Sequence, residues 1–180
     1  MVRALKRLNA CLGLGVDEEE VELPVAGSHR VCMLCIEWPG EIGYSIADRL
    51  NATVIPSRLL TTRLHILVSA ALAAYMIQKR RSIARKKPLN MLAVYMATRN
   101  ISRVIEVTKP CKGEPVLLVA LDNDCERLKK ESSLKVSGKC CPKLKEAFKE
   151  ITGMQLDLPE EQLERILLTR SAIVAGLGKI

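Results

Sequence analysis

Cysteines are the residues of this chain best suited to metal or redox chemistry. Seven occur, and Cys32 and Cys35 have the C-x-x-C spacing of many zinc half-sites. They lie in VCMLCIEW, which we interpret as a strand, and side chains three apart on a strand point to opposite faces. This pair therefore cannot share one metal ion. Cys140 and Cys141 are adjacent, which suits chelation poorly, and no histidine lies near them.

We therefore expect buried or incidental thiols rather than a zinc site, because free cysteine is among the most buried residue types. A disulfide in a cytoplasmic protein would be unusual unless the source is a hyperthermophile, where such bonds do occur.

Motifs for catalysis are weak throughout the chain. The segment GLG at residues 13–15 lacks the third glycine, the preceding strand and the following helix of a dinucleotide-binding loop, and no Walker A motif occurs. We expect His29 to lie in a loop, His65 to be a hydrogen-bonded core histidine, and the acidic run at residues 17–20 to be a solvated loop. A binding protein is therefore favoured over an enzyme, and we assign no catalytic residue, cofactor or metal.

The positive charge is concentrated in one central segment. Residues 58–112 hold twelve Lys or Arg against one acid, Glu106, so this segment contributes +11 to a net charge of +8 and the rest carries −3. Cations at a helix end can simply balance the negative C-terminal pole of that helix. A surface of one sign also attracts phosphates, through charge and counterion release. We favour a polyanion site in KRRSIARKK at residues 79–87, with Arg80, Arg81, Arg85, Lys86 and Lys87.

Arg99 lies in a polar step, Thr98 to Asn100, between two apolar segments that we expect to be helices. A break between helices presents free backbone N–H groups at the start of the second helix, where anions bind. Thr98, Asn100 or Ser102 can cap that helix, and the planar guanidinium of Arg99 suits a phosphate or the face of a base. A capped kink with a surface arginine is the alternative.

The aromatic residues limit which polyanion is expected. The chain has one Trp, three Tyr and one Phe, and none belongs to an interleaved basic and aromatic strand motif. This pattern argues against an RNP-type or OB-type stacking platform. An amphipathic membrane-surface helix is a weaker alternative, because the cations cluster at one end instead of spreading along a polar face.

These candidate residues require a framework of helices and short strands. Short apolar runs bounded by turn residues predict strands at residues 30–38, 51–55, 116–121 and 133–139. Helical spacing and caps predict helices at 41–50, from a Thr61 or Thr62 cap to about 78, at 88–96, at 101–110, at 122–132 and from Pro159 onward. Because the alternation is irregular, we predict a mixed α/β (α+β) fold with a small mixed or antiparallel sheet packed with several helices.

The length of 180 residues predicts one compact domain. We place a partly ordered N-terminal extension at residues 1–25 and the domain at 26–180. The most apolar stretch, residues 64–77, is shorter than the roughly 20 residues that cross a bilayer. The basic start of the chain is broken by Asn9 and two glycines before four acids, which argues against a cleaved signal peptide. We therefore expect a cytoplasmic protein that binds no membrane.

The order of these segments resembles the small KEOPS-complex subunit, the family of the PRPK-binding protein. The resemblance runs from about residue 30 to the end, through LNATVI from Leu50, RLHILVSAALAA from Arg63, LAVYMATRNI from Leu92, VLLVAL from Val116 and LERILLTRSAIVAGL from Leu163. Two positions depart from the family pattern. Met96-Ala97 stands where Ser-Gly is usual, and Asn100, which keeps an amide, stands where glutamine is usual.

The resemblance implies an accessory, non-catalytic subunit of the archaeal-type complex that makes threonylcarbamoyladenosine in tRNA. Members of the family bind the kinase-like Bud subunit and capture the single-stranded 3′ CCA end of tRNA; the threonylcarbamoyl-transferring ATPase subunit is an indirect partner. Matching positions assign the tRNA end to Arg99, Asn100 and Ile101. We expect the kinase-like subunit to bind the helices at 64–77 and 163–177, through Leu64, Leu67, Ala71, Leu163, Leu167 and Val174.

Two functions of different classes remain open. The first is a tRNA-recruiting subunit. The second is a purely structural adaptor that activates the kinase-like subunit and binds RNA no more specifically than any equally basic protein. An enzymatic activity is a distant third.

Overall fold

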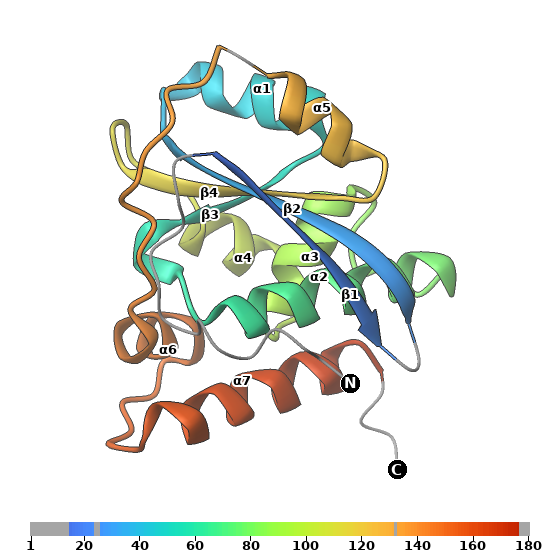
Figure 1. Cartoon of the computed structure of the whole chain (residues 1–180). Coiled ribbons are helices and arrows are strands. Elements are labelled where there is room, and N and C mark those ends of the chain that lie inside the picture. Colours follow the sequence, from blue (N-terminus) through green and yellow to red (C-terminus); the bar gives the residue numbers. More distant parts are fainter. Residues whose placement is uncertain (1–14, 24–25, 132, 177–180) are drawn as a thin grey trace.

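A four-stranded antiparallel sheet with helices on both faces forms the centre of the molecule (Figure 1). The computed structural model describes residues 15–23, 26–131 and 133–176. The strand order is β1-β2-β4-β3. The strands are β1 (Val16–Leu23), β2 (Gly27–Glu37), β3 (Thr53–Pro56) and β4 (Pro115–Leu121). The prediction of a single mixed α/β domain with a small antiparallel sheet is confirmed.

The two central strands are buried on both faces. Residues 31–36 of β2 and 116–120 of β4 are all buried. A strand that is covered on both sides has no need to alternate apolar and polar residues. This explains why both strands appear in the sequence as continuous apolar runs.

Two helices, α1 (Glu41–Leu50) and α5 (Asp124–Lys130), cover one face of the sheet (Figure 1). The buried indole of Trp38 packs beneath α1 and fixes its position. A Cβ atom at Gly43 would lie 2.7 Å from the Trp38 ring, so no larger residue fits at that turn of α1.

The opposite face carries the larger apolar core. Its helices are the short 3-10 helix η1 (Ser57–Leu59), α2 (Arg63–Gln78), α3 (Lys87–Tyr95), α4 (Ile101–Val107), α6 (Leu144–Thr152) and α7 (Glu160–Val174). Helix α2 is apolar nearly all round because the sheet, α3 and α7 all pack against it. Thr62 caps α2 by accepting a hydrogen bond from the His65 N–H at 3.2 Å, which confirms one of the two predicted caps.

The acidic run at residues 17–20 is a strand, not a solvated loop. It belongs to β1, which pairs with β2 along its whole length. Its carboxylates find cations on both faces: Glu18 lies 3.4 Å from Arg30, and Glu19 lies 2.6 Å from Arg63. β1 also precedes the expected domain start at residue 26, so the sheet of the domain includes part of the segment that we treated as an extension.

His29 was also placed wrongly, since it lies on β2 and is buried. Its Nδ1 is 3.2 Å from Asp122 Oδ2 and its Nε2 is 3.0 Å from the Ala26 carbonyl oxygen. His65, in contrast, is the hydrogen-bonded core histidine that we expected: its Nδ1 is 2.8 Å from Thr61 Oγ1 and its Nε2 is 3.1 Å from Ser171 Oγ.

The C-terminal third differs most from the prediction. Residues 133–139 form no strand, and only Val136 makes an isolated bridge, to Ile36. Helix α6 was missed, although its buried residues recur at helical spacing and could have revealed it. They are Leu144, Ala147, Phe148 and Ile151.

The cysteines of β2 point to opposite faces of the sheet, as predicted, but they are not free thiols. Cys32 forms a disulfide with Cys125 of α5, and Cys35 forms one with Cys140, with Cα–Cα distances of 5.4 and 5.8 Å. These distances are ordinary for disulfides. Both partners lie about a hundred residues away, so local spacing gave no sign of the pairing. Among the helices that the structure describes, none is long and apolar enough to cross a membrane.

Candidate polyanion-binding site

The basic run at residues 79–87 begins where α2 ends in a Schellman motif. The Arg80 N–H donates to the Ile77 carbonyl at 3.1 Å, and the Arg81 N–H donates to the Met76 carbonyl at 2.8 Å. Arg80 adopts a left-handed conformation with φ of 54°, as the residue after a helix cap commonly does. Both arginine side chains are exposed. The Schellman motif thus ends α2 and leaves Arg80 and Arg81 exposed where the positive charge of the chain is densest.

Asn90 anchors the loop at residues 79–86 to the core. Its side chain is fully buried, accepts a hydrogen bond from the Ile83 N–H at 2.8 Å and donates one to the Ala73 carbonyl at 3.2 Å. A buried amide must be paired in this way. Sequence reasoning missed Asn90, although a polar residue within an apolar helix stripe was the available signal.

Helix α3 ends in a second Schellman motif. The Ala97 N–H donates to the Val94 carbonyl at 3.0 Å, and the Thr98 N–H donates to the Ala93 carbonyl at 2.9 Å. Ala97 has φ of 49°. The left-handed conformation that glycine favours is therefore present at the position where this chain has Ala97 and the family pattern has glycine.

Helix α4 starts with a cap made by Asn100. The Asn100 Oδ1 accepts a hydrogen bond from the Arg103 N–H at 3.1 Å, which confirms one of the three predicted caps. The Asn100 N–H in turn donates to Thr98 Oγ1 at 3.2 Å. Ile101 is half-buried against the core. Of the three residues expected at a tRNA end, Arg99 and Asn100 are exposed, and the amide oxygen of Asn100 already serves the cap.

Two arginines from different segments lie at the C-terminal end of α7. The Arg99 Nη2 donates to the Val174 carbonyl at 3.1 Å, and the Arg81 Nη1 lies 4.0 Å from where a Cβ on Gly176 would stand. A helix C-terminus attracts cations, so this placement needs no ligand to explain it. Both side chains stay exposed, so guanidinium N–H groups remain for other partners. We call Arg81, Arg99 and the turn at 174–176 the arginine patch.

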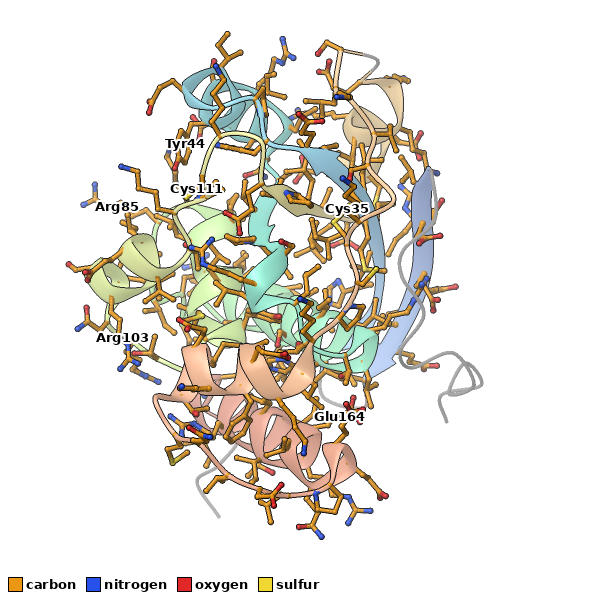
Figure 2. The ribbon with its side chains drawn as sticks, turned by 90° about the vertical axis from the view of Figure 1, so that its left-hand side faces the viewer. Cys35, Tyr44, Arg85, Arg103, Cys111 and Glu164 are labelled. Atoms are coloured by element: carbon orange, nitrogen blue, oxygen red, sulfur yellow. A yellow bond between two sulfur atoms is a disulfide. The ribbon has the colours of Figure 1, made fainter. Side chains whose placement is uncertain are left out.

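The other predicted cations do not all join this patch. Lys86 Nζ lies 2.6 Å from Asp48 of α1, and Lys87 Nζ lies 3.5 Å from Asp124 of α5. These lysines stand at the start of α3, whereas Arg99 follows its end, roughly 13 Å away along nine residues of helix. Arg85 is exposed, as is Arg103 of α4, and Figure 2 shows both on one side of the molecule. The predicted cluster is therefore divided along α3.

The residues expected to bind the kinase-like subunit mostly belong to the core of this chain. Helices α2 and α7 pack against each other, and the side chains at their contact are used there. Leu64 and Val174 are half-buried. The buried residues are Leu67, Ala71, Leu163 and Leu167. Apolar spacing in the sequence identified the buried faces of α2 and α7, but it could not distinguish a contact within the core from a contact with a partner.

Two exposed apolar side chains lie instead at a groove of about 670 Å³ between α1, α3 and α4. Tyr44 of α1 and Ile105 of α4 line it and are 39% and 52% exposed. Leu89 and Leu92 of α3 form part of its wall. Figure 2 shows Tyr44 close to Cys111, which is an exposed free cysteine.

Comparison with known proteins adds no family to this description. No family model matches the chain, and no curated protein matches it. The resemblance stated above therefore rests on the sequence segments quoted for it.

Proposed function

We propose that this protein is a non-catalytic accessory subunit of the KEOPS complex, which makes threonylcarbamoyladenosine in tRNA. In this role it binds the kinase-like Bud subunit and recruits tRNA through its 3′ CCA end. The observation that carries the proposal is the arginine patch. Arg81 and Arg99 are eighteen residues apart in the sequence, yet both are exposed and lie at the C-terminal end of α7, beside Gly176 and Val174.

The chemistry of the patch suits an unpaired RNA end. A guanidinium can pair with a phosphate in a fork and can also stack on a base, which matters in a chain with so few aromatic rings. Ile173, in the last turn of α7, is 55% exposed and adds apolar surface for a base. A duplex read only by charge would require neither feature.

The proposal predicts that Arg99→Glu lowers the affinity for tRNA by about tenfold or more, because it replaces an attractive charge with a repulsive one at the contact. A matched control is Lys130→Glu, which makes the same change of charge at an exposed position on α5. Affinities are measured by fluorescence anisotropy with labelled tRNA. Equal losses in both variants would contradict the assignment to the patch.

The second candidate function is a purely structural adaptor for the kinase-like subunit. It is favoured by the hydrogen bond from Arg99 to Val174, because a helix C-terminus alone accounts for that arginine. The adaptor predicts stable pairing with the kinase-like subunit and RNA affinity no greater than that of any protein of equal charge.

The groove between α1, α3 and α4 supports the protein-binding part of the proposal better than α2 and α7 do. Protein interfaces have apolar centres, and the exposed Tyr44 and Ile105 side chains offer such a surface. Ile105→Arg should weaken binding of the kinase-like subunit in a pull-down of the two purified proteins and leave tRNA affinity unchanged.

A role in tRNA modification places the protein in the cytoplasm. The two disulfides are compatible with that location in a hyperthermophile, whose intracellular proteins are rich in disulfides.

A further inference from the structure

The segment at residues 133–143 joins α5 to α6 with little regular structure. Its backbone contact with the sheet is one isolated bridge between Val136 and Ile36, and its Leu134 side chain is buried in the apolar cluster that includes Ile36. The Glu37 N–H donates to the Lys135 carbonyl at 3.0 Å, and the Ser137 N–H donates to the Cys35 carbonyl at 2.9 Å. Lys135 Nζ lies 2.6 Å from Glu37 Oε2, but both side chains are largely exposed, so this ion pair contributes little.

These few bonds cover an edge of the sheet that β1 does not reach. The pairing of β1 with β2 begins at Val16 opposite Leu34, so residues 35–37 of β2 lie beyond it. Lys135 and Ser137 occupy this place in the ladder. An uncovered strand edge presents unpaired N–H and C=O groups to solvent or to another strand.

Covalent bonds hold this segment more firmly than its hydrogen bonds do. Cys140 forms the disulfide with Cys35 of β2, and both sulfur-bearing residues are almost fully buried. Cys141, the next residue, is disulfide-bonded as well. One attachment of this segment to β2 therefore depends on the redox state of Cys35 and Cys140.

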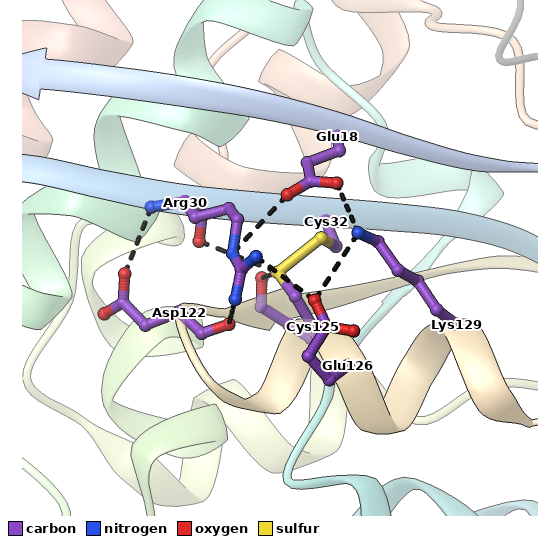
Figure 3. The surroundings of a disulfide bond; sticks show 8 residues. Glu18, Arg30, Cys32, Asp122, Cys125, Glu126 and Lys129 are labelled. Carbon is purple, nitrogen blue, oxygen red and sulfur yellow. Dashed lines mark hydrogen bonds and ion pairs between the residues drawn. A yellow bond between two sulfur atoms is a disulfide. The ribbon is translucent and has the colours of Figure 1, made fainter.

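The other disulfide of β2 lies among many non-covalent contacts (Figure 3). Cys32 is bonded to Cys125 of α5, and α5 is also tied down by Arg30 and Lys129. The Arg30 guanidinium bonds the Asp122 carbonyl and Glu126, and Lys129 lies 2.5 Å from Glu18 of β1. Loss of the Cys32–Cys125 bond leaves these contacts in place.

We propose that the Cys35–Cys140 disulfide is a redox-sensitive staple that keeps residues 133–139 on the free edge of β2. Reduction breaks its S–S bond and leaves two cysteine thiols. A dithiol supplies the two electrons and two protons and becomes a disulfide itself. The segment then leaves the edge and uncovers the backbone of residues 35–37.

Hydrogen exchange of the full chain tests this inference. In the variant Cys35→Ser/Cys140→Ser, amide exchange at residues 133–139 should quicken about tenfold or more, while β4 and α7 keep their wild-type rates. The matched control, Cys32→Ser/Cys125→Ser, should leave exchange at 133–139 unchanged. Wild-type exchange at 133–139 in the first variant would overturn the proposal.

A second measurement avoids any folding failure of these variants. The wild-type chain is treated with increasing dithiol, exposed thiols are alkylated, and the labelled cysteines are identified by mass spectrometry. Cys35 and Cys140 should be labelled at dithiol concentrations that leave Cys32, Cys125 and the circular dichroism spectrum unchanged. Labelling of both pairs together, as the spectrum is lost, would overturn the proposal.

Discussion

His65 sits in a buried polar network that joins three helices. Its ring stacks on Tyr95 at 4.7 Å between centroids, and its two nitrogens face Thr61 Oγ1 and Ser171 Oγ. The Tyr95 hydroxyl donates to the Leu59 carbonyl at 2.6 Å. Complete burial lowers the pKa of His65 from 6.5 to about 3 and raises the pKa of Tyr95 to about 12. The imidazole is therefore neutral in the folded protein at neutral pH.

This network predicts a pH-dependent stability. The unfolded chain binds a proton at His65 below pH 6.5 and the folded chain does not, so the stabilisation is complete above pH 6.5 and is lost as pH falls toward 3. At pH 5 the loss should be about 2 kcal/mol. Urea unfolding of the wild type and of His65→Gln at pH 7 and pH 5 measures it. An equal loss in the variant would contradict this origin.

Ala97 carries a conformational strain that glycine would relieve. A non-glycine residue in the left-handed region destabilises the folded state by roughly 1–2 kcal/mol. Glycine removes this strain, but its greater conformational freedom in the unfolded chain offsets part of the stabilisation. Ala97→Gly should therefore raise the free energy of unfolding by about 0.5 kcal/mol. Chemical denaturation compares it with Ala93→Gly, a buried and ordinary helical position that should be destabilised. A loss of stability in Ala97→Gly would show that the backbone there is not strained.

At the scale of elements, the arginine patch depends on how two helices end. Schellman motifs stop α2 and α3 and turn Arg81 and Arg99 toward α7. Between these ends, the loop at 79–86 is held by the buried Asn90. The geometry of the arginine patch is therefore fixed by backbone hydrogen bonds and the side-chain amide of Asn90, not by the arginines themselves.

Removal of the Asn90 amide should loosen this loop. Asn90→Ala leaves the Ile83 N–H without its partner and should lower the free energy of unfolding by about 2 kcal/mol. The matched change Asn100→Ala removes an exposed cap from α4 and should cost about 1 kcal/mol. Hydrogen exchange should quicken at residues 79–86 only in Asn90→Ala. Equal exchange at 79–86 in the two variants would contradict the anchoring role.

Sequence patterns predicted the elements whose signals are local. The helix at residues 41–50 was predicted with its observed bounds, and Thr62 is one of the two caps predicted for α2, since the apolar spacing and the cap lie within a few residues of each other. The disulfides of Cys32 and Cys35 join positions about a hundred residues apart and leave no local trace. The burial of Leu163 and Leu167 depends on α2, so only the tertiary structure could separate core from surface there.

At the scale of the whole molecule, charge is separated between two regions. The acids of β1 pair with Arg30, Arg63 and Lys129, whereas Arg80, Arg81 and Arg99 extend into solvent from the ends of α2 and α3. The hydrogen bond from Lys129, with its charge, keeps the pKa of Glu18 below its ordinary value. A polyanion that approaches this molecule is therefore drawn to the arginine side.

The most direct test of the account is the affinity of the full chain for intact tRNA and for the same tRNA without its terminal CCA, each across a salt series. Recruitment through the 3′ end predicts that trimming lowers affinity by about tenfold or more at every salt concentration, because a specific contact is lost in addition to phosphate pairing. Equal affinities with the same salt dependence would contradict recruitment through the 3′ end and favour the structural adaptor.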